Sequence, residues 1–182
     1  MLLYHTGFDQ IKEPDVHYGR KNADFGQGFY LTAESEFAHR WAGEKKDAKT
    51  YVNRYELNTE GLQIHHFQRD EAWFQYIYGN RHLKPDELEA DVIIGPIAND
   101  TIYDTLGIVT SGFLEPEEAM QLLMIGPEYQ QITLKTKKAA EHLQWLGAEE
   151  ISSDEIAKYH ETVAAEEAEY QRLFAAELEK LQ

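Results

Sequence analysis

The clearest pattern along the chain is an alternation of two kinds of position at residues 50–57. Large apolar side chains and one amide occupy one set of alternate positions, namely Tyr51, Asn53, Tyr55 and Leu57. A period of two is that of a β-strand with one buried face, so this segment is predicted to be a strand. Shorter runs of strand-forming residues predict further strands over residues 1–5, 29–32, 92–96 and 130–134.

Apolar residues spaced three and four positions apart predict helices between these strands. The first helix covers residues 34–43, with Ser35 as its N-cap and Gly43 as its end. Gly147 closes the last of the further predicted helices, which cover residues 70–78, 116–124 and 136–146.

A single long helix is predicted from about residue 152 onward, where Ser152 and Glu155 have the spacing of a capping box. One side carries an apolar stripe at roughly helical spacing, formed by Ile156, Tyr159, Val163, Tyr170, Phe174, Leu178 and Leu181. Glu166 and Glu167 interrupt this stripe, which argues against an extended coiled coil. Two interpretations stay open. The stripe packs on the domain's own sheet, or the helix is exposed and binds a groove, pairs with itself or binds a partner protein such as an antitoxin.

Strands mixed with short helices, without regular βαβ spacing, predict an α+β fold rather than a doubly wound parallel sheet. The chain is accordingly divided into one domain, residues 1–150, and a C-terminal amphipathic helix, residues 151–182. With 182 residues, of which 42% are hydrophobic, the chain is long and apolar enough to bury a core.

Composition narrows the chemistry. The chain has no Cys, which excludes disulfides, thiolate nucleophiles and Cys-based zinc sites. No metal site is expected, because the adjacent His65 and His66 would point to opposite faces of a strand. No apolar run approaches the roughly 18 to 20 residues of a membrane span, so a cytoplasmic location is expected. The net charge of -16 disfavours non-specific binding to nucleic acid.

Two short motifs near the N-terminus carry the candidate chemistry. Leu3-Tyr4-His5-Thr6-Gly7 predicts a strand that delivers one His into a turn. Phe25-Gly26-Gln27-Gly28-Phe29-Tyr30-Leu31-Thr32 predicts a glycine loop that enters an aromatic strand. Cleavage of the glycosidic bond of NAD needs an aromatic face for nicotinamide, a hydrogen-bonding group for the adenosine ribose and stabilisation of an oxocarbenium-like ribosyl cation. His5, Tyr30 and a polar residue on a later strand would meet these needs.

The two motifs resemble the first two signature blocks of the ADP-ribosyltransferases with a His-Tyr-Glu triad, the branch of diphtheria toxin and the poly-ADP-ribose polymerases. The chain looks closer still to an uncharacterised bacterial family of ADP-ribosyltransferase-like domains, through the same blocks and residues 51–55, 80–81, 91–100 and 130–133. This resemblance covers residues 1–147. It implies two small packed β-sheets around an NAD cleft, with flanking helices and a C-terminal helical extension.

The resemblance implies that His5 binds a ribose hydroxyl, that the backbone at Thr6 holds the carboxamide and that Tyr30 stacks on nicotinamide. Thr6 is a departure, because the relatives place Gly directly after the His. Asn53 is either a buried hydrogen-bond anchor or a cofactor-binding residue. Arg81 either caps its helix or contacts the pyrophosphate. The remaining members of the cofactor-binding set are Gly7, Gly28 and Thr32.

The third position of the triad is a second departure. Gln131 stands where the triad has Glu, and Gln130 and Glu128 are the alternatives for this position. A neutral amide can hydrogen-bond the ribose, but it supplies neither a negative charge nor a base. The resemblance therefore favours single transfer over chain synthesis, with a catalytic set of His5, Tyr30 and Gln131.

The expected function is NAD-dependent mono-ADP-ribosyl transfer, with NAD as substrate and a protein or nucleic acid as acceptor. The implied setting is a bacterial toxin, in a toxin–antitoxin or phage-defence system, or an effector. One alternative is a non-catalytic module that binds NAD or ADP-ribose, which the missing Glu favours. The other is an RNA 2′-phosphotransferase, which the acidity of the chain disfavours.

Overall fold

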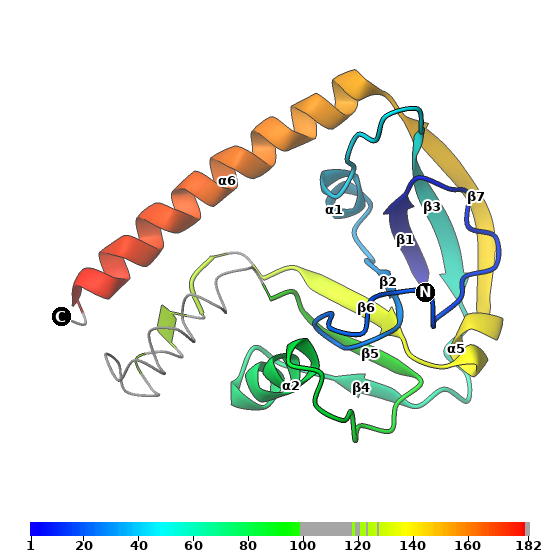
Figure 1. The fold of residues 1–182 in the computed structure, drawn as a ribbon, viewed down its shortest axis with the longest axis horizontal. Helices are drawn as coiled ribbons and strands as arrows, with labels where there is room; N and C mark the ends of the chain where they lie inside the picture. Colours follow the sequence, from blue (N-terminus) through cyan, green and yellow to red (C-terminus); the bar gives the residue numbers. More distant parts are fainter. Residues whose placement is uncertain (99–117, 119–120, 123, 127, 181–182) are drawn as a thin grey trace.

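The structure is a computed structural model that describes residues 1–98, 118, 121–122, 124–126 and 128–180. Its α+β fold is built on two small β-sheets (Figure 1). The first sheet is antiparallel, in the order β1 (Leu2–Gly7), β3 (Thr50–Leu57), β7 (Leu143–Ile151). The second has the order β2 (Phe29–Leu31), β6 (Gln130–Leu134), β5 (Val92–Pro96), β4 (Ile64–His66). Within it β4 and β5 are parallel, and the other neighbours are antiparallel.

The two sheets meet at a bridge between Tyr4 and Thr32. The Tyr4 N–H donates to the Thr32 carbonyl at 2.8 Å, and the Thr32 N–H donates back to the Tyr4 carbonyl at 3.0 Å. The strands that carry the two N-terminal motifs, β1 and β2, are therefore joined at the seam between the sheets (Figure 1).

Alternation along the strands divides the core into three clusters. Between the sheets lie Leu3, Leu31, Tyr55, Leu57, Val92, Ile132 and Leu134. The far face of the second sheet packs on α2 (Glu71–Arg81) through Phe25, Trp73, Ile77, Ile93 and Ala98. The far face of the first sheet packs on α1 (Ser35–Arg40) and the start of α6 (Ser153–Lys180) through Ala38, Ala42, Val52, Ile151 and Ile156. Because Ile132 and Leu134 face the first cluster, Gln131 and Thr133 face the α2 side.

Side chains cap the N-termini of two helices, α2 and α6. The Asp70 side chain accepts a hydrogen bond from the Trp73 N–H at 3.0 Å and caps α2, which runs three residues past its predicted end. The capping box before α6 is confirmed, because Glu155 Oε2 accepts from the Ser152 N–H at 3.0 Å and Ser152 Oγ accepts from the Glu155 N–H at 3.3 Å.

The predicted helix over residues 136–146 is wrong. Only Lys137–Glu141 is helical, as α5, and the chain then forms β7 as the partner of β3. The apolar run at 143–146 suits a helix or a strand equally, and pairing with β3 decides between them. Gly147, predicted to end the helix, has φ 140° and lies opposite Arg54, beside a break in the strand register.

The first predicted helix is too long. α1 ends at Arg40 rather than Gly43, and Ser35 is its first residue rather than its cap. Glu34 holds the cap position without a side-chain bond, and Thr32 Oγ1 instead accepts from the Glu34 N–H at 3.2 Å. Most of the predicted helix 116–124 lies outside the described residues, and β4 has no counterpart among the predicted strands.

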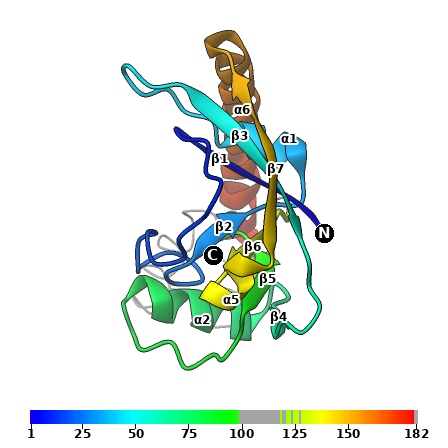
Figure 2. The same cartoon turned by 90° about the vertical axis from the view of Figure 1, so that its right-hand side faces the viewer.

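The long helix α6 begins on the domain and runs beyond both sheets (Figures 1 and 2). Ile156 in its first turn is buried with Val52 and Ile151. Val163, farther along the predicted apolar stripe, is 37% exposed, whereas Tyr170 is buried and lies against Gly126. The stripe therefore meets the domain's own sheet at its N-terminal end. In the described part of the chain, no helix has the length and apolarity to cross a bilayer.

Candidate functional site

His5 lies on β1 at the seam between the sheets, where its ring packs on Phe29 with the centroids 4.5 Å apart. Its Nδ1 is 2.7 Å from the backbone carbonyl oxygen of Tyr30. A carbonyl can only accept, so Nδ1 carries the proton and donates. Burial lowers the pKa of His5 below the usual 6.5, against the opposing effect of this hydrogen bond. Neutral His5 therefore offers Nε2 as a hydrogen-bond acceptor.

Gly7 leaves room beside that acceptor. A Cβ atom placed on Gly7 would lie 3.4 Å from Nε2 of His5, so a larger residue here would crowd the imidazole. The side chain of Thr6 is already engaged, because its hydroxyl donates to the carbonyl oxygen of Ala38 in α1. The side chain of Thr6 is therefore held by α1.

Tyr30 fixes the glycine loop that precedes its own strand. Its hydroxyl accepts from the Phe25 N–H at 2.9 Å and donates to the Gly26 carbonyl at 2.7 Å. Gly26 has φ 70°, a conformation that side chains disfavour. Burial raises the pKa of Tyr30 well above its usual value, so the hydroxyl stays protonated and keeps both bonds. The ring itself is partly buried.

Gly28 and Thr32 shape β2 at its two ends. A Cβ atom on Gly28 would lie 2.7 Å from the Leu134 carbonyl oxygen, so Gly is the residue that lets β2 approach β6. Thr32 is fully buried, and its hydroxyl donates to the Gln130 carbonyl at 3.4 Å. Both residues hold the strand that carries Tyr30.

Gln131 lies on the α2 face of β6, the face that also carries Thr133, which pairs with Tyr30. It is 4% exposed, and its Nε2 donates to Asp24 Oδ2 at 3.2 Å and to the Pro96 carbonyl at 3.3 Å. The two alternatives for the third position bond each other on an exposed surface instead, with Gln130 Nε2 at 2.8 Å from Glu128 Oε1.

Sequence reasoning missed Asp24, which joins several of these elements. Its side chain is 10% exposed and its Oδ1 lies 2.6 Å from Nη2 and 2.8 Å from Nε of Arg81. The guanidinium of Arg81 thus grips a buried carboxylate and also donates to the Ala98 carbonyl at 3.1 Å. The signal available in the sequence was an acidic residue directly before the Phe25-Gly26 pair.

Asn53 lies opposite His5 in the β1–β3 register and is fully buried. Its Oδ1 accepts from the Ile11 N–H at 2.9 Å and from Trp145 Nε1 at 3.2 Å. Its Nδ2 donates to the Asp9 carbonyl at 2.9 Å. These bonds tie the chain after β1 to the middle strand of the first sheet, and so steady the strand that carries His5.

Two hollows lie on the surface of the described residues. One, of about 380 Å³, borders the glycine loop and is lined by Lys21, Gly26, Gln27, Asn80, Leu83, Lys84, Asp86 and Lys135. The other, of about 420 Å³, lies between residues 44–50 and 150–156. Neither hollow is lined by His5, Tyr30 or Gln131. Within the described residues, no group of three or more His, Asp or Glu side chains could hold a metal ion.

Comparison with known proteins assigns the chain to a family. Residues 1–145 match the family described as "Protein of unknown function (DUF3990)", and the chain therefore belongs to it. The match ends within β7 and leaves α6 outside. No curated protein matches the chain, and no solved structure does.

Proposed function

We propose that this member of a family of unknown function is an NAD-dependent mono-ADP-ribosyltransferase, with NAD bound at the seam where its two sheets meet, beside β1 and β2. The observation that carries the proposal is the hydrogen bond from His5 Nδ1 to the Tyr30 carbonyl, which joins the two motifs into one constellation. This bond holds the imidazole in the tautomer whose Nε2 accepts. A hydroxyl of the adenosine ribose donates to that nitrogen.

The remaining contacts to NAD follow from the groups that the site leaves free. Tyr30 presents its partly buried ring to nicotinamide, while its hydroxyl stays with Phe25 and Gly26. The amide oxygen of Gln131 accepts from a hydroxyl of the ribose that carries nicotinamide. The backbone at Thr6 and Gly7 binds the carboxamide, because the Thr6 hydroxyl is held by Ala38.

The reaction is dissociative. The bond between ribose C1′ and the nicotinamide nitrogen breaks first, and its electron pair leaves with the ring as neutral nicotinamide. The nucleophile of the acceptor then adds to C1′ of the cation and releases its proton. Gln131 is not a base, so the proton passes to solvent or to the acceptor's own groups, which favours a single transfer. The acceptor is a protein or a nucleic acid, in the setting of a toxin or an effector.

The test is incubation of the purified protein with NAD labelled in its adenylate phosphate and a bacterial lysate, followed by digestion with protease or nuclease. We expect macromolecular label and free nicotinamide with the wild type, and at least about tenfold less of both with His5→Ala. His66→Ala is the matched control, because His66 is exposed and lies on β4, at the other edge of the second sheet from β2. Full turnover by His5→Ala would refute the assignment of the pocket.

One observation favours a second candidate. Gln131 supplies an amide where a transferase of this type has a carboxylate, and a non-catalytic module that binds NAD or ADP-ribose needs no carboxylate. This alternative expects saturable binding of ADP-ribose, lost in His5→Ala, with no release of nicotinamide. Isothermal titration of ADP-ribose beside the turnover assay separates the two functions.

A further inference from the structure

We propose that Asp24 is a positioning residue of the site: it fixes the amide of Gln131 with the oxygen as the group offered to a ligand, and it makes Gln the residue that fits there in place of Glu. The contact stands on the geometry alone. Its consequence for turnover rests on the proposed function.

The carboxylate of Asp24 is fully engaged by internal donors. Arg81 donates to Oδ1 from two nitrogens, at 2.6 and 2.8 Å. Oδ2 accepts from the Ala98 N–H at 3.1 Å and from Gln131 Nε2 at 3.2 Å. The backbone carbonyl of Asp24 accepts from Asn80 Nδ2 at 3.3 Å. The residue therefore connects the glycine loop to the end of α2, the segment after β5 and the start of β6.

The chemistry of its neighbours fixes which way the Gln131 amide faces. Asp24 Oδ2 and the Pro96 carbonyl oxygen are both acceptors, so the group that lies between them must be the NH₂ group. Its two hydrogens are used by these two contacts. The amide oxygen is then the atom of Gln131 that remains for a ribose hydroxyl.

The same contacts disfavour Glu at position 131. A Glu carboxylate would place one oxygen against Asp24 Oδ2 and the Pro96 carbonyl oxygen, two acceptors in a nearly dry setting. Arg81 already pairs with Asp24 and donates to Ala98. One proton would have to be shared between the two carboxyl groups. The carboxylate of this site therefore belongs to Asp24, which lies before β2, whereas the Glu of the His-Tyr-Glu triad would lie on β6 at position 131.

The test is a double-mutant cycle of Asp24→Asn and Gln131→Glu, in which the melting temperature of each variant is measured at pH 7.5 and pH 5. At pH 7.5 we expect Gln131→Glu to lower the melting temperature by roughly 5 °C or more beyond the control Gln171→Glu, an exposed position on α6. The deficit should shrink at pH 5, where the added carboxyl can hold its proton. The double variant keeps the total charge and lets the new amide at position 24 donate to the new carboxylate at position 131. It should therefore melt above Gln131→Glu.

Additive effects in the cycle would overturn the proposal, as would a Gln131→Glu deficit no larger than that of Gln171→Glu. If Asp24→Asn alone fails to fold, the pH-dependent deficit of Gln131→Glu against its control decides. A side-chain readout is independent of folding effects: the Gln131 NH₂ resonances of the wild type should exchange slowly with solvent. Fast exchange would also contradict the proposal.

Turnover of NAD separates this inference from the proposed function. If the cycle shows coupling but the wild type does not turn over NAD, the contact between Asp24 and Gln131 is supported and the proposed transferase function is refuted. If the wild type turns over NAD but the effects in the cycle are additive, only the positioning role of Asp24 is refuted. If both stand, Asp24→Asn should lower kcat about tenfold with the fold retained, and the double variant should recover more activity than Gln131→Glu.

Discussion

Arg40 on α1 and Glu166 on α6 form an ion pair at 2.6 Å, between helices that are otherwise joined near the start of α6. The Arg40 guanidinium also donates to the Tyr129 hydroxyl at 2.6 Å, and that hydroxyl donates to Glu166 at 3.0 Å. Three segments of the chain are thus tied together by polar side chains. Glu166, which interrupts the apolar stripe of α6, thus adds a polar contact between α6 and the domain.

Replacement of Glu166 by Gln should loosen α6 beyond its first turns. The amide cannot pair with Arg40 as a carboxylate does, and the cost to global stability is about 1 kcal/mol, because Glu166 is partly exposed. Hydrogen exchange of the α6 amides after residue 160 should accelerate, while those near Ile156 stay protected. Glu179→Gln, at an exposed position of the same helix, should leave the exchange pattern unchanged.

Tyr30→Phe keeps the ring and removes the hydroxyl that holds the glycine loop. The N–H of Phe25 and the carbonyl of Gly26 would lose their partner, at a cost of about 1 to 2 kcal/mol in the free energy of unfolding. Under the proposed function, KM for NAD should rise more than kcat falls, because the stacking ring remains. Urea unfolding and steady-state kinetics measure both effects. The exposed Tyr18→Phe is the control. Equal free energies of unfolding and equal KM values for the two variants would show that the Tyr30 hydroxyl does not stabilise the glycine loop.

Local signals could be predicted from the sequence, and distant partners could not. The alternation at residues 50–57 and the capping box of Ser152 and Glu155 depend on neighbours in the chain, and both are present in the structure. The strand β7 depends on pairing with β3, and its apolar run fits a helix equally well. The bond between Asp24 and Gln131 joins residues 107 positions apart, so no local pattern announces it.

The pH dependence of turnover should reflect the lowered pKa of His5. Its burial favours the neutral ring, so the accepting Nε2 persists below the usual pKa of 6.5 and is lost only on further acidification. The free energy of unfolding changes in the same direction. The contribution of neutral His5 is fully present above the unfolded pKa of 6.5 and declines as pH falls below it, because the unfolded state then binds the proton more readily. An NMR titration of the His5 ring beside a pH profile of kcat/KM checks both. A His5 pKa at or above 6.5 would contradict the burial argument.

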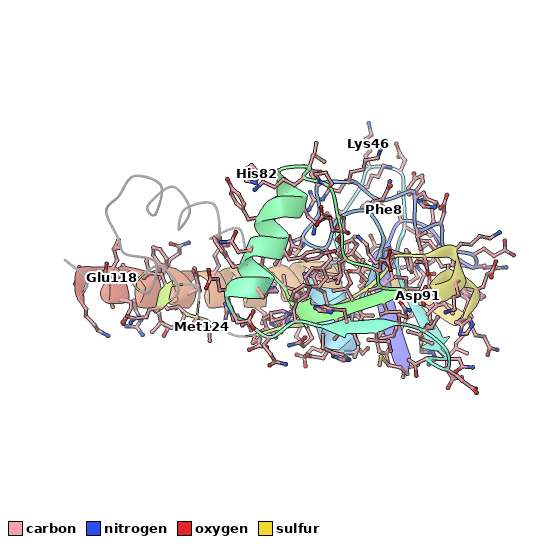
Figure 3. All side chains as sticks on the ribbon, turned by 90° about the horizontal axis from the view of Figure 1, so that it is seen from below. Phe8, Lys46, His82, Asp91, Glu118 and Met124 are labelled. Carbon is pink, nitrogen blue, oxygen red and sulfur yellow. The ribbon has the colours of Figure 1, made fainter. Side chains whose placement is uncertain are left out.

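Asp91 should stabilise the fold at neutral pH. It lies near α5 at the start of β5 (Figure 3) and accepts from the Gln63 N–H at 2.9 Å, the Thr136 hydroxyl at 2.7 Å and Lys138 Nζ at 3.0 Å. These bonds, that of Gln63 first, lower the pKa of Asp91 to about 2. The shift corresponds to about 2 kcal/mol of stability, present above the unfolded pKa of 3.8 and lost as pH falls toward 2.

Asp91→Asn should therefore lose about 2 kcal/mol in urea unfolding at pH 7, and the gap from the wild type should narrow at pH 3. Asp154→Asn, at an exposed position of α6, is the control. A gap of constant size across this range would mean that the carboxylate charge is not what stabilises the site.

Gly28→Ala should test how closely β2 must approach β6. The added Cβ would lie 2.5 Å from Thr133 Cγ2 and 2.7 Å from the Leu134 carbonyl oxygen, so the strand has to move. Overpacking of this kind costs about 3 kcal/mol, which lowers the melting temperature of a chain this size by roughly 10 °C. Gly43→Ala is the matched control, because its Cβ would meet nothing within 4 Å. Because the displaced strand carries Tyr30, NAD binding measured well below both melting temperatures should weaken in Gly28→Ala and stay unchanged in Gly43→Ala. Equal melting temperatures for the two variants would show that β2 can shift without cost.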